Sequence, residues 1–285
     1  MVRRRAPLDR LIRMDALIRS IDTARLERDS RGEYEQVPPT ADLGGAEGPA
    51  VSDRTPFPQT SVALSEATRE RERLLPAGAP GPIGAAYKML RTQVLRRLSS
   101  INANSLAVLS ASNGEGKTLT AINLAVAVAA DPAHTALLVD LDLRNPSIHR
   151  RLGMRPTVGI EDCLSKRRGV QEALVRIQGY DRLTVLPARG RVEQSSDLLL
   201  SARMVELMLE LRSRYSNRIL IFDLPPVLLA DDALAFSRLV QAGLFVVAES
   251  KTEREQLARG LMLLDKLPII GTVLNLSKES IGSYY

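Results

Sequence analysis

The chain has 285 residues, of which 45% are hydrophobic and 25% are charged, the composition of an ordinary globular protein. Its single cysteine, Cys163, excludes an intramolecular disulfide, and none of its apolar runs approaches the ~18 residues that span a bilayer. The net charge of +6 would suit nucleic acid, an anionic membrane or an acidic polymer, but it fits equally well with basic side chains spread over a solvated surface.

Residues 1–80 are predicted to form a basic, largely disordered arm with an amphipathic helix near residues 8–28. Charged residues interrupt the segment after MVRRR every few positions, so it lacks the apolar core of a signal peptide. The helix could lie on a membrane surface or a partner, or be a frayed arm with little function. Residues 30–60 have the composition of a linker, and a short charged helix is expected at 65–74. Apolar side chains at steps of three and four define the first helix: Leu11, Met14, Ile18, Ile21 and Ala24.

Residues 81–279 are predicted to form an α/β domain, because short aliphatic runs alternate with helical stretches. Runs that are apolar on both faces and separated by helices indicate a three-layer fold, a mostly parallel sheet flanked by helices. Ligands of such folds bind at the carboxyl ends of the strands. The helical stretches include TLTAINLAVAVAA at 118–130 and SARMVELMLELRSRY at 201–215. The expected strands are LAVLSA, TALLVDLDL, RLTVLPA, RILIFDLPP, GLFVVAES and IIGTVLNL.

A glycine-rich loop follows the first of these strands. The stretch SASNGEGKTL has the strand, loop and helix context of a phosphate-binding loop, although Ala111 stands where the strict pattern G-x-x-x-x-G-K-[ST] has glycine. Lys117 is expected to reach the β- and γ-phosphates of ATP, and the Thr118 hydroxyl to ligate Mg²⁺. Backbone N–H groups and the helix N-terminus should hold the phosphates. The predicted nucleotide-binding residues are Asn113, Gly114, Glu115, Gly116, Lys117, Thr118 and Leu119.

Carboxylates end two later strands. Asp140 and Asp142 alternate with apolar residues in LLVDLDL, and Asp223 follows four apolar residues in ILIFD, which is a Walker B pattern. Some of these carboxylates can hold Mg²⁺ while another accepts a hydroxyl proton. Lys117, Asp140, Asp142 and Asp223 are therefore the predicted catalytic residues, and they indicate phosphoryl transfer from ATP.

The motifs SNGEGKT, LLVDLDLRNP and FDLPPVLLADDA resemble those of the bacterial tyrosine kinases of polysaccharide export, P-loop proteins whose fold is related to the partition and septum-site ATPases. The resemblance covers residues 83–277 and the tail. The YY ending, together with RILIFDLPPVLL, is most similar to autokinases of exosortase-linked exopolysaccharide loci. The resemblance implies a non-specific protein-tyrosine kinase that uses ATP and Mg²⁺ and regulates the polymerisation or export of a polysaccharide.

The resemblance also assigns roles to single residues. Asp140 would be the base toward the tyrosine hydroxyl. Asp142, Asp223 and the Thr118 hydroxyl would bind the magnesium ion. The phosphate acceptors would be Tyr284 and Tyr285, in a flexible tail at 280–285.

Partners follow from the same resemblance. Relatives are regulated by a membrane protein that sets polymer chain length. That activator would here be a separate protein, and the kinase would be cytoplasmic and peripheral at the inner face of the plasma membrane. A homo-oligomer is expected, although the family's oligomerisation pattern E-x-x-R-x-x-R meets Ala85, Lys88 and Arg91 in this chain, so that only the last residue is kept. Nucleic acid is not an expected partner, because basic and aromatic residues do not interleave.

Two other functions stay open at this point. A partition or septum-site ATPase would share the fold and the paired aspartates, but it carries a signature lysine early in its loop, where this chain has Ser112. A non-catalytic scaffold would bind ATP and gate the export machine without modifying tyrosine. The eroded oligomerisation pattern favours the scaffold, and the complete set of carboxylates with Lys117 counts against it.

Overall fold

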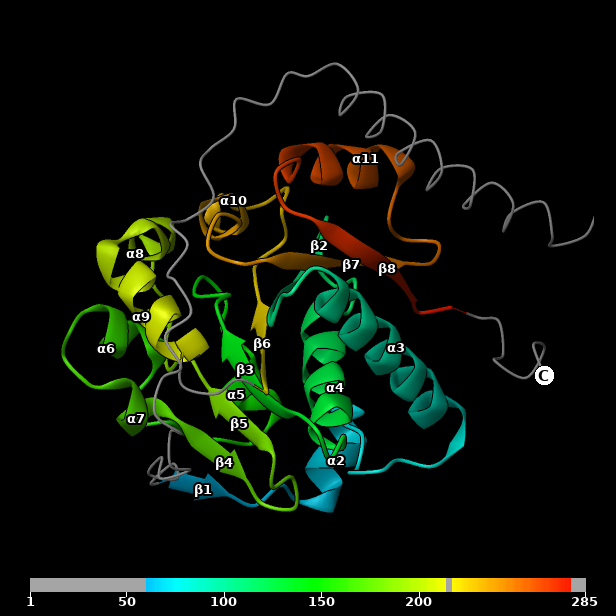
Figure 1. The fold of residues 1–285 in the computed structure, drawn as a ribbon, viewed down its shortest axis with the longest axis horizontal. Helices are drawn as coiled ribbons and strands as arrows, with labels where there is room; N and C mark the ends of the chain where they lie inside the picture. Colours follow the sequence, from blue (N-terminus) through cyan, green and yellow to red (C-terminus); the bar gives the residue numbers. More distant parts are fainter. Residues whose placement is uncertain (1–59, 214–216, 278–285) are drawn as a thin grey trace, which may run out of the picture. The chain divides into compact units, whose positions relative to one another are not determined.

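A mostly parallel β-sheet lies at the centre of the part of the chain that the structure, a computed structural model, describes: residues 60–213 and 217–277. Its eight strands run in the order β1-β4-β5-β3-β6-β2-β7-β8 (Figure 1). Neighbouring strands are parallel except for β4 and β5. The strands are β1 (Thr60–Val62), β2 (Ser105–Ser110), β3 (Thr135–Asp140), β4 (Val175–Ile177), β5 (Leu183–Leu186), β6 (Arg218–Asp223), β7 (Ala242–Ala248) and β8 (Ile269–Asn275).

The strands form where the sequence has short aliphatic runs. Every residue of β2, SLAVLS, and of β6, RILIFD, is buried, as expected for strands that are covered on both faces. All six predicted strands are confirmed, as β2, β3, β5, β6, β7 and β8. The strands β1 and β4 are not among the predicted ones, because three residues each are too few to show the period of a strand.

Helices connect the strands and cover the sheet. The predicted helices at 118–130 and 201–215 are confirmed as α4 and α9. Ten of the 13 residues of α4 are buried, which agrees with its being apolar almost all round. The helices are α2 (Glu66–Glu72), α3 (Gly81–Ser100), α4 (Lys117–Ala129), α5 (Ile148–Arg151), α6 (Ile160–Leu164), α7 (Val170–Ala173), α8 (Ser195–Leu200), α9 (Ala202–Ser213), α10 (Asp232–Phe236) and α11 (Arg254–Leu263).

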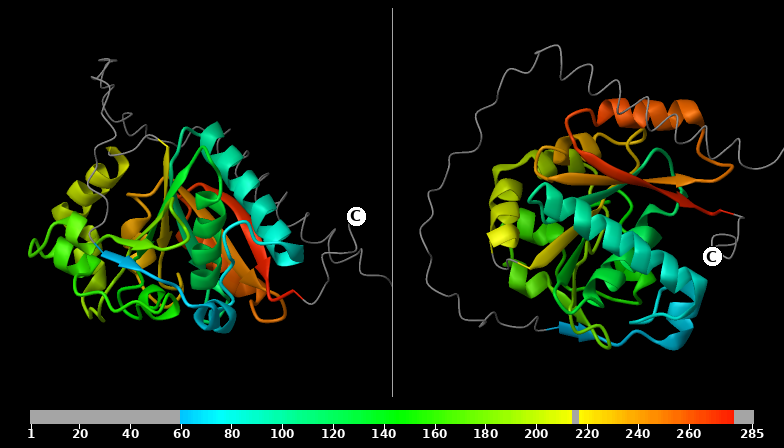
Figure 2. Two further views of the ribbon diagram at one scale, coloured as in Figure 1. Left: turned by 90° about the horizontal axis from the view of Figure 1, so that it is seen from below. Right: turned by 45° about the vertical axis from the view of Figure 1, so that its right-hand side comes forward.

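Helices lie on both faces of the sheet, which confirms the predicted three-layer fold (Figures 1 and 2). On one face, α3 and α4 share a core with the strands, and this core includes Leu98 of α3, Leu124 of α4 and Val108 of β2. The other face carries α9, α10 and α11. There Phe236 of α10 packs against Phe222 of β6, with 4.8 Å between the ring centroids. Both faces of the central strands are therefore covered by helices, and a ligand can reach only the ends of these strands.

The folded part begins before residue 81, the predicted domain boundary. β1 pairs in parallel with β4, and Leu74, after α2, is 5% exposed and belongs to the core. The side chain of Asn123 in α4 donates to the carbonyl of Arg73 at 3.1 Å and accepts from the N–H of Leu75 at 2.9 Å. Residues 60–80 thus belong with the sheet. The predicted helix at 8–28 and the predicted tyrosine tail lie outside the described residues.

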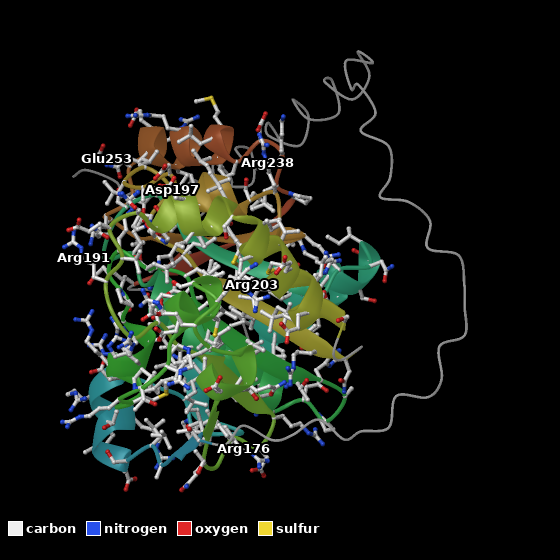
Figure 3. The ribbon with its side chains drawn as sticks, turned by 90° about the vertical axis from the view of Figure 1, so that its left-hand side faces the viewer. Arg176, Arg191, Asp197, Arg203, Arg238 and Glu253 are labelled. Carbon is white, nitrogen blue, oxygen red and sulfur yellow. The ribbon has the colours of Figure 1, made fainter. Side chains whose placement is uncertain are left out.

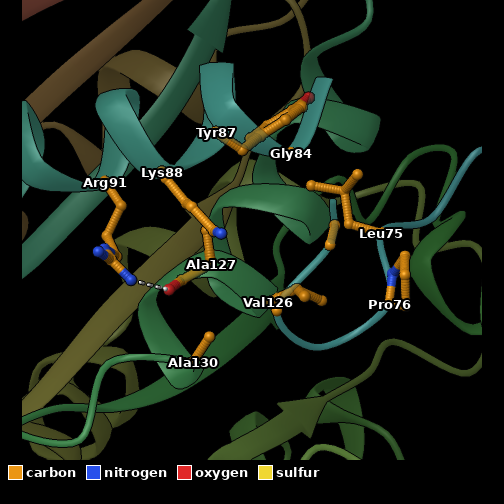
Figure 4. A pocket seen from close by; sticks show the side chains of 11 residues that line it. Leu75, Pro76, Gly84, Tyr87, Lys88, Arg91, Val126, Ala127 and Ala130 are labelled. Carbon is orange, nitrogen blue, oxygen red and sulfur yellow. Dashed lines mark hydrogen bonds between the residues drawn. The ribbon is translucent and has the colours of Figure 1, made fainter. Parts of the chain in front are cut away.

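A small hollow lies between α3, α4 and the segment 75–79 (Figure 4). Its volume of about 20 Å³ has room for a water molecule and not for a nucleotide. Lys88 and Arg91, two of the positions that match the family's oligomerisation pattern, line it, and Arg91 Nη1 donates to the carbonyl of Ala127 in α4 at 3.4 Å. The hollow is roughly 15 Å along α4 from Lys117, so it is no part of the predicted phosphate site.

Basic side chains are spaced apart on one face of the molecule. In Figure 3, Arg176, Arg191, Arg203 and Arg238 come from different parts of the chain and lie apart from one another. Arg203 pairs with Glu206, with 3.1 Å between the charged groups. This arrangement favours the interpretation in which positive charge is spread over the surface. Within residues 60–213 and 217–277, each helix is too short or too polar to cross a bilayer.

Candidate active site

Three neighbouring strands bring the predicted site residues to one edge of the sheet. β6 lies between β3 and β2, and Asp140 at the end of β3 stands opposite Asp223 at the end of β6. The loop at 111–116 leaves the end of β2 and leads into α4. Because the carboxyl ends of parallel strands meet at the same edge, residues more than 100 positions apart come within contact distance.

The loop has the backbone of a phosphate cradle. Gly114 and Gly116 have φ angles of 72° and 91°, which residues with a side chain rarely adopt. A methyl group on Gly116 would clash with the side-chain amide of Asn275, so this position also lacks the space for a side chain. α4 begins directly after Gly116 and directs its N-terminus at the loop. Ala111, the departure from the strict pattern, is fully buried at the start of the loop.

The side chain of Glu115 braces the loop. It is 1% exposed, and its Oε2 accepts from the N–H of Ser112 at 2.8 Å while its Oε1 accepts from the Thr252 hydroxyl. The Glu115 carbonyl accepts from Asn275 Nδ2 at 2.8 Å. The carboxylate of this predicted nucleotide-binding residue is thus engaged within the protein, which leaves its backbone N–H as the group to face phosphate.

Lys117 lies among the predicted carboxylates. Its Nζ is 2.7 Å from Asp223 Oδ1 and 3.5 Å from Asp142 Oδ2. The side chain of Lys117 is 7% exposed, that of Asp142 is 13% exposed, and that of Asp223 is fully buried. Burial alone would lower the pKa of Lys117, but the charges of Asp223 and Asp142 outweigh it and raise the pKa above its usual value. The lysine is therefore a permanent cation.

Asp140 is the most enclosed member of the cluster. Its Oδ2 accepts from the N–H groups of Ser147 and Ile148 at 3.1 and 3.0 Å, and its Oδ1 is buried without a hydrogen-bond partner among the described residues. Burial, followed by the charge of Asp223, raises the pKa of Asp140 well above its usual range. Burial also raises the pKa of Asp142, against the opposing charge of Lys117.

The cluster is rich in negative charge. Three carboxylates face one ammonium group, and the second oxygen of Asp223, Oδ2, has no hydrogen-bond partner among the described residues either. Within the described ranges, no group of three or more His, Cys, Asp or Glu side chains is placed to enclose a metal ion on its own. Mg²⁺ is commonly held by one or two carboxylates together with substrate phosphates. The unpartnered oxygen of Asp223, with the neighbouring carboxylate of Asp142, fits such an ion.

The structure thus brings together Lys117, Asp140, Asp142 and Asp223. Thr118 lies beside them in the first turn of α4, half-buried. Asn113 is exposed at the outer side of the loop, and Leu119 faces the core beneath α4 as a half-buried side chain.

Arg144, which follows the DLDL motif, forms a cluster that the sequence reasoning did not find. Its Nε donates to Asp232 Oδ2 at 2.8 Å and to Ser195 Oγ at 3.1 Å, and its Nη2 pairs with Asp231 Oδ1 at 2.7 Å. Asp231 stands at the N-terminus of α10 but makes no side-chain cap hydrogen bond there. The two adjacent aspartates were the feature of the sequence that could have pointed to this cluster. Their contact with Arg144 is seen only in the folded structure.

Replacing Arg144 with methionine is expected to destabilise the protein by about 2 kcal/mol, because Asp232 is fully buried and would lose its cationic partner. The cost stays below that of a fully buried pair, since the Arg144 side chain is 39% exposed. Urea unfolding measures the change. Asp231→Asn is the matched control and should cost little, because its side chain is 64% exposed. Equal losses from both variants would contradict this account.

A strand, a glycine loop and a helix, with a buried lysine and carboxylates on the neighbouring strands, define a P-loop nucleotide-binding protein of the α/β class. No protein-family model matches the sequence. Curated relatives do: the chain is 34% identical over 204 residues to the tyrosine-protein kinase YwqD of Bacillus subtilis, an alignment that covers 70% of this chain and 84% of YwqD. The chain belongs to the bacterial tyrosine-protein kinases.

Longer relatives match over a part of their length. The chain is 29% identical over 210 residues to the tyrosine-protein kinase wzc of Salmonella typhi, which covers 72% of this chain and 28% of wzc. The exosortase-linked subgroup is not shown by any of these relatives and stays a prediction.

Solved structures share the fold. The kinase domain of VpsO superposes with a TM-score of 0.62 at 26% identity, over 69% of this chain and 96% of that domain. The cell division ATPase MinD of Pyrococcus furiosus superposes with a TM-score of 0.53 at 25% identity, over 63% of this chain and 76% of MinD. The predicted kinship with both folds is confirmed, and the curated relatives favour the kinases over the septum-site ATPases.

Proposed function

We propose that the protein is an ATP- and Mg²⁺-dependent tyrosine autokinase that regulates the polymerisation or export of a polysaccharide. The observation that carries the proposal is the cluster of Lys117 with Asp142 and Asp223 beside a phosphate-binding loop. Membership in the bacterial tyrosine-protein kinases supports the reaction. Similarity to a septum-site ATPase structure that was solved with Mg-ADP supports the cofactor.

In the proposed mechanism, the loop at 111–116 and the N-terminus of α4 bind the phosphates, and Lys117 leaves Asp223 to contact them. Asp142 and Asp223 would hold Mg²⁺ together with the Thr118 hydroxyl, and the ion would supply positive charge to the transferring phosphoryl group.

Asp140 is the proposed base toward the tyrosine hydroxyl. Its raised pKa and its unpartnered Oδ1 suit proton uptake from a hydroxyl group. Asp140 is fully buried, whereas the Asp142 side chain is 13% exposed, so the proposal requires the site to open toward the incoming tyrosine.

The acceptors in this proposal are Tyr284 and Tyr285, which would enter the site of a neighbouring subunit. The added phosphate charge would then repel the tail and loosen the assembly. The predicted helix at 8–28 would be the docking element toward a separate membrane activator, which would hold the kinase at the inner face of the plasma membrane. These parts lie outside the described residues or beyond the comparisons, and they stay predictions.

The test is to incubate the purified full chain with labelled ATP and Mg²⁺, and to follow phosphotyrosine, free phosphate and DNA binding. The double variant Tyr284→Phe/Tyr285→Phe is expected to lose nearly all phosphotyrosine and to keep ATP binding, since the nucleotide site is untouched. Tyr34→Phe is the matched control and should be labelled normally.

Each alternative has its own outcome. Normal labelling of the double variant would contradict the tail proposal. Absence of label from the wild-type chain, even with the cytoplasmic segment of the membrane activator added, would favour the scaffold. Free phosphate and DNA binding without phosphotyrosine would favour the partition ATPase.

A further inference from the structure

The turn after β7 places a second lysine on the phosphate-binding loop. Residues 248–252 fold back on themselves: the N–H groups of Lys251 and Thr252 donate to the carbonyl of Ala248 at 3.2 and 3.0 Å. Ser250 adopts a φ of 61°, which is uncommon for a residue with a side chain. A strained residue in a short loop beside a ligand cradle is a frequent device for fixing a functional side chain.

This turn is fastened to the loop through one side chain. The Thr252 hydroxyl accepts from the N–H of Ala248 at 2.9 Å and donates to the buried carboxylate of Glu115. Glu115 in turn accepts from the N–H of Ser112. The turn and the loop are therefore held in a fixed relation, and Lys251 is carried with them.

The ammonium group of Lys251 lies over Gly114. A methyl group on Gly114 would clash with Lys251 Nζ, so the lysine stands at the surface of the loop where a side chain is absent. Lys251 itself is exposed. Among the described residues, no carboxylate pairs with Lys251, whereas Lys117 at the other end of the loop is paired with Asp223 and Asp142. An unpaired cation held over a phosphate cradle calls for an anionic ligand.

We propose that Lys251 is a second nucleotide-binding cation, which contacts the diphosphate that ADP and ATP share. The inference rests on the proposed function and deepens it. Lys117 would contact the transferring phosphoryl group from the side of the loop where the carboxylates lie. Lys251 would contact the diphosphate from the side of Gly114. The loop has Ser112 where partition ATPases carry their signature lysine, so Lys251 adds the positive charge from within the same chain.

ADP titration of the full chain in the presence of Mg²⁺, followed by calorimetry, tests the proposal. Lys251→Met is expected to weaken ADP and ATP binding by roughly tenfold each, since one charge-assisted contact is lost. It should raise the KM for ATP and leave kcat unchanged at saturation, because the contact is the same before and during transfer. Lys251→Arg should recover most of the affinity, and Lys266→Met, an exposed lysine after α11, should bind as the wild type does.

Salt separates a phosphate contact from a structural role. The ADP affinity of the wild type should fall more steeply with ionic strength than that of Lys251→Met. Equal ADP affinities of the wild type and Lys251→Met would overturn the inference and leave the proposed function standing. A lowered unfolding temperature with unchanged affinity would do the same and assign Lys251 to loop stability. A wild-type chain that binds no ADP would overturn both proposals.

Discussion

Replacing Lys117 with methionine is expected to lower the autokinase rate at least about 100-fold, because the phosphoryl group loses its cation in a water-poor site. The same change is expected to cost about 3 kcal/mol of stability. Lys117 is the cation that faces Asp223, Asp142 and Asp140, and without it the fully buried Asp223 has no ion-pair partner among the residues that the structure describes. The two effects are measured by phosphotyrosine labelling and by urea unfolding.

The double variant Lys117→Met/Asp223→Asn separates the two effects. It removes the charge that Lys117 compensates, so it should recover much of the lost stability, yet it should stay inactive because both the cation and a magnesium carboxylate are gone. If Lys117→Met were as stable as the wild type, the ion pair between Lys117 and Asp223 would not be the state of the nucleotide-free protein. If it kept its activity, Lys117 would have no part in phosphoryl transfer.

The central part of this fold was predictable because each signal was local. The six predicted strands are short, mainly aliphatic runs. The P-loop is marked by Gly114, Gly116 and Lys117 within four residues. The carboxylates could be assigned to the same edge because Asp140 and Asp223 each end a strand, and parallel strands share the edge where they end. Pattern and position within an element were sufficient for these residues.

The supports of the site could not be predicted, because they depend on contacts between distant segments. Thr252 and Glu115 are 137 residues apart and meet because β7 lies beside β2. Arg144 and Asp232 are 88 residues apart and meet across the same edge. Neither pair has a period or a spacing that marks it, since threonine, arginine and acidic residues are common in exposed loops. Both contacts depend on the order of the strands in the sheet, which cannot be read from the sequence pattern.

Replacing Asp140 with asparagine is expected to make the protein more stable and inactive at once. The change removes one of three carboxylates that face one ammonium group, and the asparagine oxygen can still accept from the N–H groups of Ser147 and Ile148. The gain should be about 1 to 2 kcal/mol at pH 7, or roughly 4 °C in the unfolding temperature. The autokinase rate should fall at least about 100-fold, because the proposed base is gone.

The pH dependence of this gain has a definite sign. The pKa of Asp140 is raised in the folded protein, so the folded state holds this proton more tightly than the unfolded state does. The wild type therefore loses stability as the pH rises from about 4, the usual pKa of an aspartate, through the raised pKa. The advantage of Asp140→Asn should be largest above that range and vanish near pH 4. The exposed Asp265→Asn should change neither stability nor activity. An advantage that stayed constant from pH 4 to 8 would show that packing, and not the buried charge, separates the two proteins.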